Sequence, residues 1–193
     1  PKNFSAFNNL GISYKKLKRY KESETSLLNS IAINPDYINA MVNIGNLKNE
    51  TYFFNDSIKY YKQAIKLNNR LPSTYLNLAN VYQTINQIEE AKKYLNKAID
   101  IDETFTIADQ KFSMLEKYDK GNLHLKTMLE KFKSKDLDDA KKIYLCFGIY
   151  KALNDIGDYQ ESVKYLKLGN KLQRGLLNYD IDFHKSLSKK IKK

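Results

Sequence analysis

Helix breakers, cysteine and tryptophan are scarce or absent in this sequence, and each shortage excludes a class of protein. Its 193 residues include seven glycines, three prolines, one cysteine and no tryptophan. So few breakers favour long helices over a strand-rich fold. The single cysteine, Cys146, excludes an intramolecular disulfide and a multi-cysteine metal site. Because no apolar run reaches 18 residues, we expect no membrane insertion, and no signal peptide is recognisable.

The positive charge of the chain is rich in lysine and poor in arginine. The formal net charge is +11, and only three of the 33 basic residues are arginines. Specific phosphate and base recognition uses the planar fork of arginine, so we do not expect a nucleic-acid partner. Lys, Asn and Ile, all abundant here, are also the residues that AT-rich codons encode. We therefore interpret the charge as a solvated surface, with an anionic partner as the alternative.

The chain repeats itself with a period of 34 residues. An asparagine, an aliphatic residue and a small residue recur in that order at 9–11, 43–45 and 77–79. Within each period the apolar residues are spaced by three, four and seven, which predicts two amphipathic helices per unit. Neither helix can bury its apolar stripe alone, so the units must stack.

These residues resemble the tetratricopeptide repeat (TPR). The residues that match its pattern in the first unit are Phe7, Leu10, Gly11, Tyr14, Ser23, Leu27 and Pro35. The second unit is looser, because Lys48 replaces the tyrosine and Asn69 replaces the proline. The resemblance implies an all-α, right-handed TPR solenoid of about five helix pairs with a C-terminal capping or exit helix. It also implies a non-catalytic scaffold that binds a protein or peptide segment.

The repeat pattern divides the chain into four stretches of one continuous solenoid. We expect three regular units over 1–103, an irregular helix pair over 104–135, a divergent unit over 136–179 and the capping or exit helix over 180–193. In the irregular pair, 106–118 and 124–132 read as the two helices, separated at Gly121. In the divergent unit Tyr150 stands where Gly11 and Gly45 stood, so its two helices should splay or shift.

The C-terminal block carries a second, narrower resemblance. Residues 144–159 and 165–174 are similar to the last repeat before the catalytic domain of bacterial TPR sulfotransferases. This implies, as the alternative function, a substrate-recruiting arm whose catalytic domain would follow Lys193. The chain has no initial methionine and no cap signal at its end. We therefore expect a piece of a longer protein, whose open solenoid end could associate with a second copy.

Residues that could carry catalysis are few and scattered. No Gly-rich phosphate loop is present, and His124 and His184 are the only histidines. We expect both histidines at the surface and Cys146 in the core. The sequence therefore predicts no enzyme, no cofactor and no metal, and a cytoplasmic protein.

Asparagines recur on the face of each first helix that points away from its partner helix. That face lines the concave groove of a stack, and Asn9, Asn43 and Asn77 share one column on it. The candidate peptide-binding residues are Asn9, Asn39, Asn43, Asn46, Asn77, Asn80, Ser73, Ile12 and Lys16.

A ladder of carboxamides is suited to holding an extended chain. Asparagine is a poor mid-helix residue, but its amide offers an acceptor and two donors, which can pair with both sides of a peptide bond. The column is similar to the asparagine ladder of the O-linked N-acetylglucosamine transferase; a merely polar groove is the alternative. The carboxylate clamp of chaperone-adaptor TPR domains is less well matched, since the third unit offers Ser73 and Asn77 in place of its cations.

Overall fold

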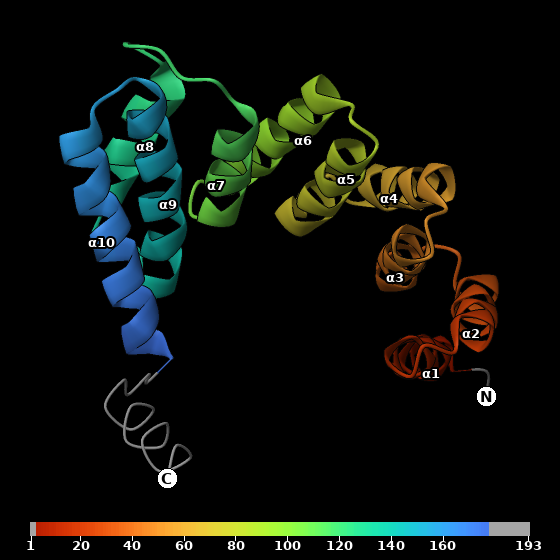
Figure 1. The fold of residues 1–193 in the computed structure, drawn as a ribbon. Coiled ribbons are helices and arrows are strands. Elements are labelled where there is room, and N and C mark those ends of the chain that lie inside the picture. The colour runs from red at the N-terminus through yellow and green to blue at the C-terminus, as the bar shows by residue number, and fades with distance from the viewer. Residues whose placement is uncertain (1–2, 178–193) are drawn as a thin grey trace, which may run out of the picture. The chain divides into compact units, whose positions relative to one another are not determined.

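The structure, a computed structural model, describes residues 3–177 and is all-α over that stretch, which confirms the predicted fold class. The predicted C-terminal helix and His184 lie outside the described residues. Figure 1 shows the helices, which are α1 (Phe4–Lys16), α2 (Tyr20–Ile33), α3 (Ile38–Glu50), α4 (Phe54–Leu67), α5 (Pro72–Thr84), α6 (Ile88–Ile101), α7 (Thr106–Leu115), α8 (Leu123–Phe132), α9 (Asp139–Asp155) and α10 (Tyr159–Leu176).

The helices form two compact units, Pro1–Glu103 and Thr104–Lys193. The first unit contains three helix pairs, in which α1 packs on α2, α3 on α4 and α5 on α6. Each first helix has 13 residues and each second helix has 14. Within this unit α1, α3 and α5 lie on the inner side of the curve and α2, α4 and α6 on the outer side (Figure 1).

Small residues allow the two helices of a pair to touch at backbone distance. The Ser23 hydroxyl donates to the Gly11 carbonyl at 2.8 Å, and the Ser57 hydroxyl donates to the Gly45 carbonyl at the same distance. A Cβ atom on Gly45 would lie only 2.6 Å from Cε1 of Tyr61. Both residues at the equivalent crossing of the third pair are buried alanines, Ala79 and Ala91.

Stacking of the pairs buries the apolar stripe that no single pair can cover. Ile44 of α3 is fully buried and packs with Leu27 of α2, and Leu78 of α5 is also fully buried. Leu10, the equivalent residue of α1, is 42% exposed. No helix precedes α1 in the described chain, so this face of the first pair lacks the neighbour that covers Ile44.

The loop between the two helices of a pair repeats the same backbone conformation. Lys18, Tyr52 and Asn86 are in the left-handed region, with φ of 58°, 64° and 60°. The backbone N–H of the next residue donates a hydrogen bond to a carbonyl near the end of the first helix, as Phe53 N does to the Lys48 carbonyl at 2.8 Å. This arrangement satisfies helix-terminal carbonyls and fixes where the second helix starts.

The second unit departs from the repeat in its first two helices. α7 ends at Leu115, three residues earlier than the sequence predicted, and the chain then runs extended. Contacts with α9 explain the early end, because Lys151 donates to the Glu116 carbonyl and Asp155 accepts from the amide of Tyr118 at 3.1 Å. Both α7 and α8 pack on α9, and a hydrophobic core that includes Met128, Leu145 and Ile149 forms there.

The last pair is longer than the others and its close approach is shifted. α9 has 17 residues and α10 has 18. Tyr150 occupies the glycine position of the repeat, so the helices meet instead at Gly169, where a Cβ atom would lie 3.0 Å from that of Cys146. Gly169 is in the repeat position of Ser30, and the contact therefore moves away from the connecting loop.

Replacing Gly45 with alanine tests the helix crossing. Tyr61 is 1% exposed and packs directly over Gly45, so the added methyl group should lower the free energy of unfolding by about 1–3 kcal/mol. Urea unfolding measures the change. Gly175→Ala is the matched control, because no atom lies within 4 Å of its added Cβ, and its stability should stay equal or rise. Equal stability of Gly45→Ala and the parent would refute the crossing.

Candidate functional site

The predicted site residues fall on neighbouring first helices of the first unit. α1 contacts α3, and α3 contacts α5. Five of the nine residues are partly buried, namely Ile12, Asn43, Asn46, Asn77 and Asn80. The other four, Asn9, Lys16, Asn39 and Ser73, are exposed. The face is therefore polar and accessible along all three helices.

The first two asparagines of the ladder are joined through a third that the sequence analysis missed. Asn8 is 4% exposed. Its Nδ2 donates to Oδ1 of Asn9 at 3.3 Å, and its Oδ1 accepts from Nδ2 of Asn43 at 2.8 Å. Asn8 thus connects α1 to α3 and holds the amides of two ladder residues in a defined orientation.

The second link of the ladder runs through Asn46 to Asn77. Oδ1 of Asn46 accepts from the Tyr61 hydroxyl at 2.6 Å and from Nδ2 of Asn77 at 3.3 Å. Burial raises the pKa of Tyr61, so its hydroxyl keeps the proton that it donates. The ladder is therefore held by two separate links between neighbouring helices, Asn9–Asn8–Asn43 between α1 and α3 and Asn46–Asn77 between α3 and α5.

In each linked pair these bonds leave a free amide nitrogen on one helix and a free amide oxygen on the next. Asn9 and Asn46 use their oxygens, so each retains its Nδ2 as a donor. Asn43 and Asn77 use a nitrogen, so each retains Oδ1 as an acceptor. Within residues 3–177 no further side-chain hydrogen bond engages these four groups. The face thus presents a donor and an acceptor in each of two linked pairs.

Asn8 could have been found from the repeat alignment itself. Its counterparts 34 and 68 residues later are Val42 and Leu76, both apolar. An asparagine in an otherwise apolar column marks a buried amide that needs partners.

Two lysines next to this face are already neutralised. Lys15 lies 3.5 Å from Glu50, and Lys48 lies 2.7 Å from Glu24. Lys48 also sits 5.0 Å from the centre of the Phe53 ring, which explains how a lysine is accommodated at the tyrosine position of the second repeat.

His124 is not at the surface, contrary to the expectation from the sequence. Its Nε2 is 3.3 Å from the buried carboxylate of Asp109, which also accepts from Lys131 at 2.9 Å. The Tyr118 hydroxyl lies 2.6 Å from Nδ1 of His124. Because Asp109 is completely buried and its partners come from α8, this cluster is an ion pair that ties α7 to α8.

The described residues contain no group of three or more side chains placed to hold a metal ion. None of the helices in the described part of the chain is long and apolar enough to cross a membrane.

The comparison with protein families identifies the repeat. The family model of the tetratricopeptide repeat matches residues 4–37 and 72–105. These two segments are the first and third helix pairs with their loops; the unmatched pair between them is the one with Lys48 and Asn69. The chain therefore contains tetratricopeptide repeats, as the sequence predicted. The comparison with curated proteins found no match.

Solved structures share the fold at low sequence identity. The MamA protein superposes with a TM-score of 0.66 and 16% identity, covering 92% of this chain and 96% of its own. A putative kinesin light chain with TPR-like repeats from Podosopora anserina gives 0.66 and 13%, over 89% and 95%. The first TPR of Spaghetti (RPAP3), bound to an HSP90 peptide, gives 0.55 and 16%, over 58% and 89%.

Cys146 occupies a core position, as the sequence predicted. It is fully buried between α9 and α10, and burial raises the pKa of its thiol from 9.0 to about 11. Within the described residues, burial is the one influence that shifts this pKa, and it disfavours the thiolate.

Labelling with a thiol reagent tests this placement. At pH 8 the raised pKa lowers the thiolate fraction about 100-fold, and burial also blocks access. The native protein should react far more slowly than the protein in urea, and its rate should rise as the pH approaches 11. Absorbance of the released reagent gives both rates; equal rates at pH 8 would mean that Cys146 is exposed.

Proposed function

We propose that the first unit binds an extended protein segment by its backbone, using the asparagines of α1, α3 and α5. The fold is a tetratricopeptide-repeat scaffold, and one of its structural neighbours, the first TPR of RPAP3, has an HSP90 peptide bound. The observation that carries the proposal is the orientation of the amides, in which Nδ2 of Asn9 and Asn46 and Oδ1 of Asn43 and Asn77 have no side-chain partner within residues 3–177.

A peptide backbone complements this alternation. Each peptide unit offers one carbonyl acceptor and one amide donor, and an extended segment presents them repeatedly along its length. Amides that are already held by Asn8, Asn46 and Tyr61 lose little freedom when a ligand binds, which favours affinity. Recognition through the backbone makes binding tolerant of the ligand's side chains.

The charges favour an internal segment over a free carboxyl terminus. A terminal carboxylate needs cations that are free to pair with it. Lys15 and Lys48 are each engaged by a glutamate, so the exposed Lys16 is the single cation among the nine residues of the face. The third repeat places Ser73 and Asn77, not basic residues, on this face. The proposed ligand is therefore a stretch within a chain.

Removing the ladder must also remove its internal connector. In a variant with alanine at Asn9, Asn43 and Asn77, the buried Asn8 would lose both partners, at a cost of about 1–3 kcal/mol of stability. Adding Asn8→Val, which copies the residue of the second repeat, avoids that cost. Asn46 keeps its bond from Tyr61 in this variant.

The quadruple variant Asn8→Val, Asn9→Ala, Asn43→Ala and Asn77→Ala should keep its fold and lose binding. With about 0.5–1.5 kcal/mol for each of the three lost ligand hydrogen bonds, binding should weaken roughly tenfold or more. The measurement is a calorimetric titration with a 12-residue peptide first selected on an array. Unchanged affinity would contradict the proposal, and a large drop in melting temperature would show that the asparagines are structural.

Two further comparisons separate backbone recognition from other modes of binding. Asn8→Val alone leaves the side-chain amides of Asn9 and Asn43 in place but free to rotate, so affinity for the peptide should fall only a few-fold. N-methylation of alternate peptide bonds in the ligand should abolish binding, because it removes the donors that Asn43 and Asn77 accept from. A scrambled peptide of the same composition should bind almost as well as the selected one; if it fails, side chains carry the recognition.

A further inference from the structure

The loop between α3 and α4 exposes aromatic side chains where the other repeats have polar ones. Tyr52 is 79% exposed and Phe53 is 59% exposed. The same two positions are Lys18 and Arg19 in the first repeat, and 86–87, an asparagine and a glutamine, in the third. The repeat fold therefore does not require aromatic residues here.

Tyr52 also occupies an unfavourable backbone position. Its φ of 64° matches the φ of Lys18 and of Asn86, so the repeat imposes the conformation. Asparagine adopts the left-handed region readily, whereas a bulky residue there is an outlier. A strained, exposed tyrosine contributes little to the fold, and such residues cluster at ligand-binding sites.

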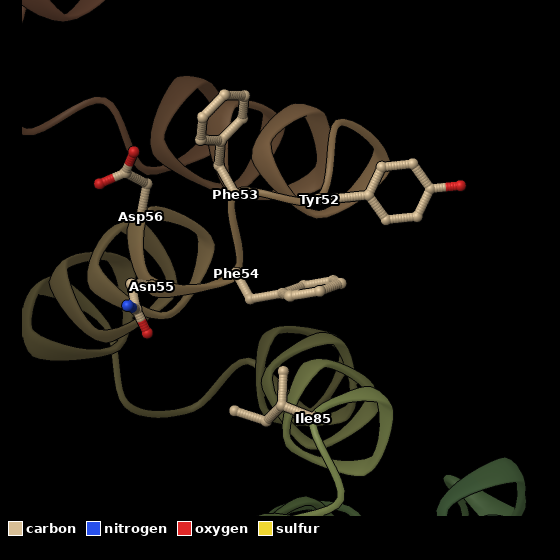
Figure 2. A pocket seen from close by; sticks show the side chains of 6 residues that line it. All are labelled: Tyr52, Phe53, Phe54, Asn55, Asp56 and Ile85. Atoms are coloured by element: carbon tan, nitrogen blue, oxygen red, sulfur yellow. The ribbon is translucent and has the colours of Figure 1, made fainter.

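Both aromatic residues line a pocket of about 540 Å³ on the loop edge of the repeats. Its lining residues are Tyr52, Phe53, Phe54, Asn55, Asp56 and Ile85. The rings of Tyr52 and Phe54 meet edge to face, with centroids 6.1 Å apart and planes at 85°. Figure 2 shows Phe54 between Tyr52 and Ile85, which comes from the loop of the next repeat, and Phe53 and Asp56 extending the other way.

The pocket contains a carboxylate whose usual partner has been replaced. Asp56 aligns with Glu22 and Glu90, the acidic residues in the first turn of α2 and α6. Glu22 pairs with Arg19 at 2.8 Å, and the hydrogen bond from Arg19 lowers the pKa of Glu22.

In the second repeat Phe53 stands at the arginine position. Over residues 3–177 the exposed Asp56 carboxylate has no ion pair. Glu90, which has glutamine at that position, is paired with Lys93 at 3.3 Å. Asp56 thus lacks the cation that each of its two counterparts has.

We propose that this pocket docks a protein partner through a large apolar side chain next to an arginine or lysine. The apolar side chain would lie against Tyr52, Phe54 and Ile85, and the cation would pair with Asp56, taking the place that Arg19 has beside Glu22. This site is separate from the asparagines of the proposed groove.

The test uses the full chain labelled with ¹⁵N and two blocked hexapeptides of glycine and serine that carry Leu-Arg or Leu-Glu at the centre. The Leu-Arg probe should shift the amide signals of residues 52–56 and 85, and should bind at least tenfold more tightly than the Leu-Glu probe. Equal affinity for the two probes, or shifts confined to other residues, would overturn the proposal.

The variant Tyr52→Lys with Phe53→Arg gives the second repeat the loop of the first. It should fold, because the same backbone already holds lysine and arginine at 18–19, and it should bind the Leu-Arg probe at least tenfold more weakly. Asp56→Asn should retain the contact with leucine and lose the preference for the Leu-Arg probe. Leu17→Ser removes an equally exposed apolar side chain from another loop and should bind as the parent does.

Two results would assign the pocket differently. If the parent dimerises in sedimentation experiments and the double variant is monomeric, a second copy fills the pocket and the proposed partner is wrong. If the Asn8, Asn9, Asn43 and Asn77 variant loses the Leu-Arg probe, the probe binds in the groove and this proposal fails. Retained binding by that variant supports a separate site, whatever the outcome for the groove.

Discussion

Contact at backbone distance between the two helices of a pair is the constraint on which the rest of the first unit depends. Ser23 and Ser57 each donate to the carbonyl of a glycine on the partner helix, and a side chain on that glycine would overlap Leu27 or Tyr61. Once a pair is fixed in this way, its apolar stripe has one orientation and the next pair can cover it. The same 34-residue spacing then places equivalent residues of α1, α3 and α5 in columns. Asn9, Asn43 and Asn77 therefore share one column because the two helices of each pair cross at equivalent positions of the repeat.

Holding amides in a fixed orientation links this packing to recognition. An isolated surface asparagine rotates freely and presents either group to a ligand. Here Asn8 is buried, so its amide needs hydrogen-bond partners within the protein. It finds them in the side chains of Asn9 and Asn43, and these bonds hold both side chains in one orientation. Tyr61, the residue that packs over Gly45, donates to Asn46 and so connects the helix crossing to the second link of the ladder. The residues that make the pair compact therefore also set the donor and acceptor pattern of the face.

The sequence predicts most where the repeat is regular and least where tertiary contacts replace it. Periodicity predicted the helix pairs of the first unit, because a 34-residue match reports the spacing of the crossings directly. It predicted the end of α7 wrongly, because Lys151 and Asp155 of α9 form hydrogen bonds with the backbone at 116–118. No local sequence signal encodes a contact with a helix some 35 residues away. It placed His124 at the surface, because the buried carboxylate that engages it comes from another helix. It put the three ladder residues in one column but missed Asn8, whose role depends on its burial.

Departures from a repeat carry information that regular positions do not. Gly11, Gly45 and Ala79 are explained by the crossing, and Ile44 and Leu78 by stacking, so their identity says nothing about a ligand. Asn8 differs from Val42 and Leu76, and Tyr52 with Phe53 differs from the polar loops at 18–19 and 86–87. Each departure has a cost that the fold does not require, a buried amide in one case and a strained, exposed aromatic residue in the other. Because neighbouring repeats show that cheaper residues fit the same backbone, the fold alone does not explain either cost. Tyr52 and Phe53 are exposed to a partner, and the buried Asn8 holds the amides of Asn9 and Asn43 on the accessible face.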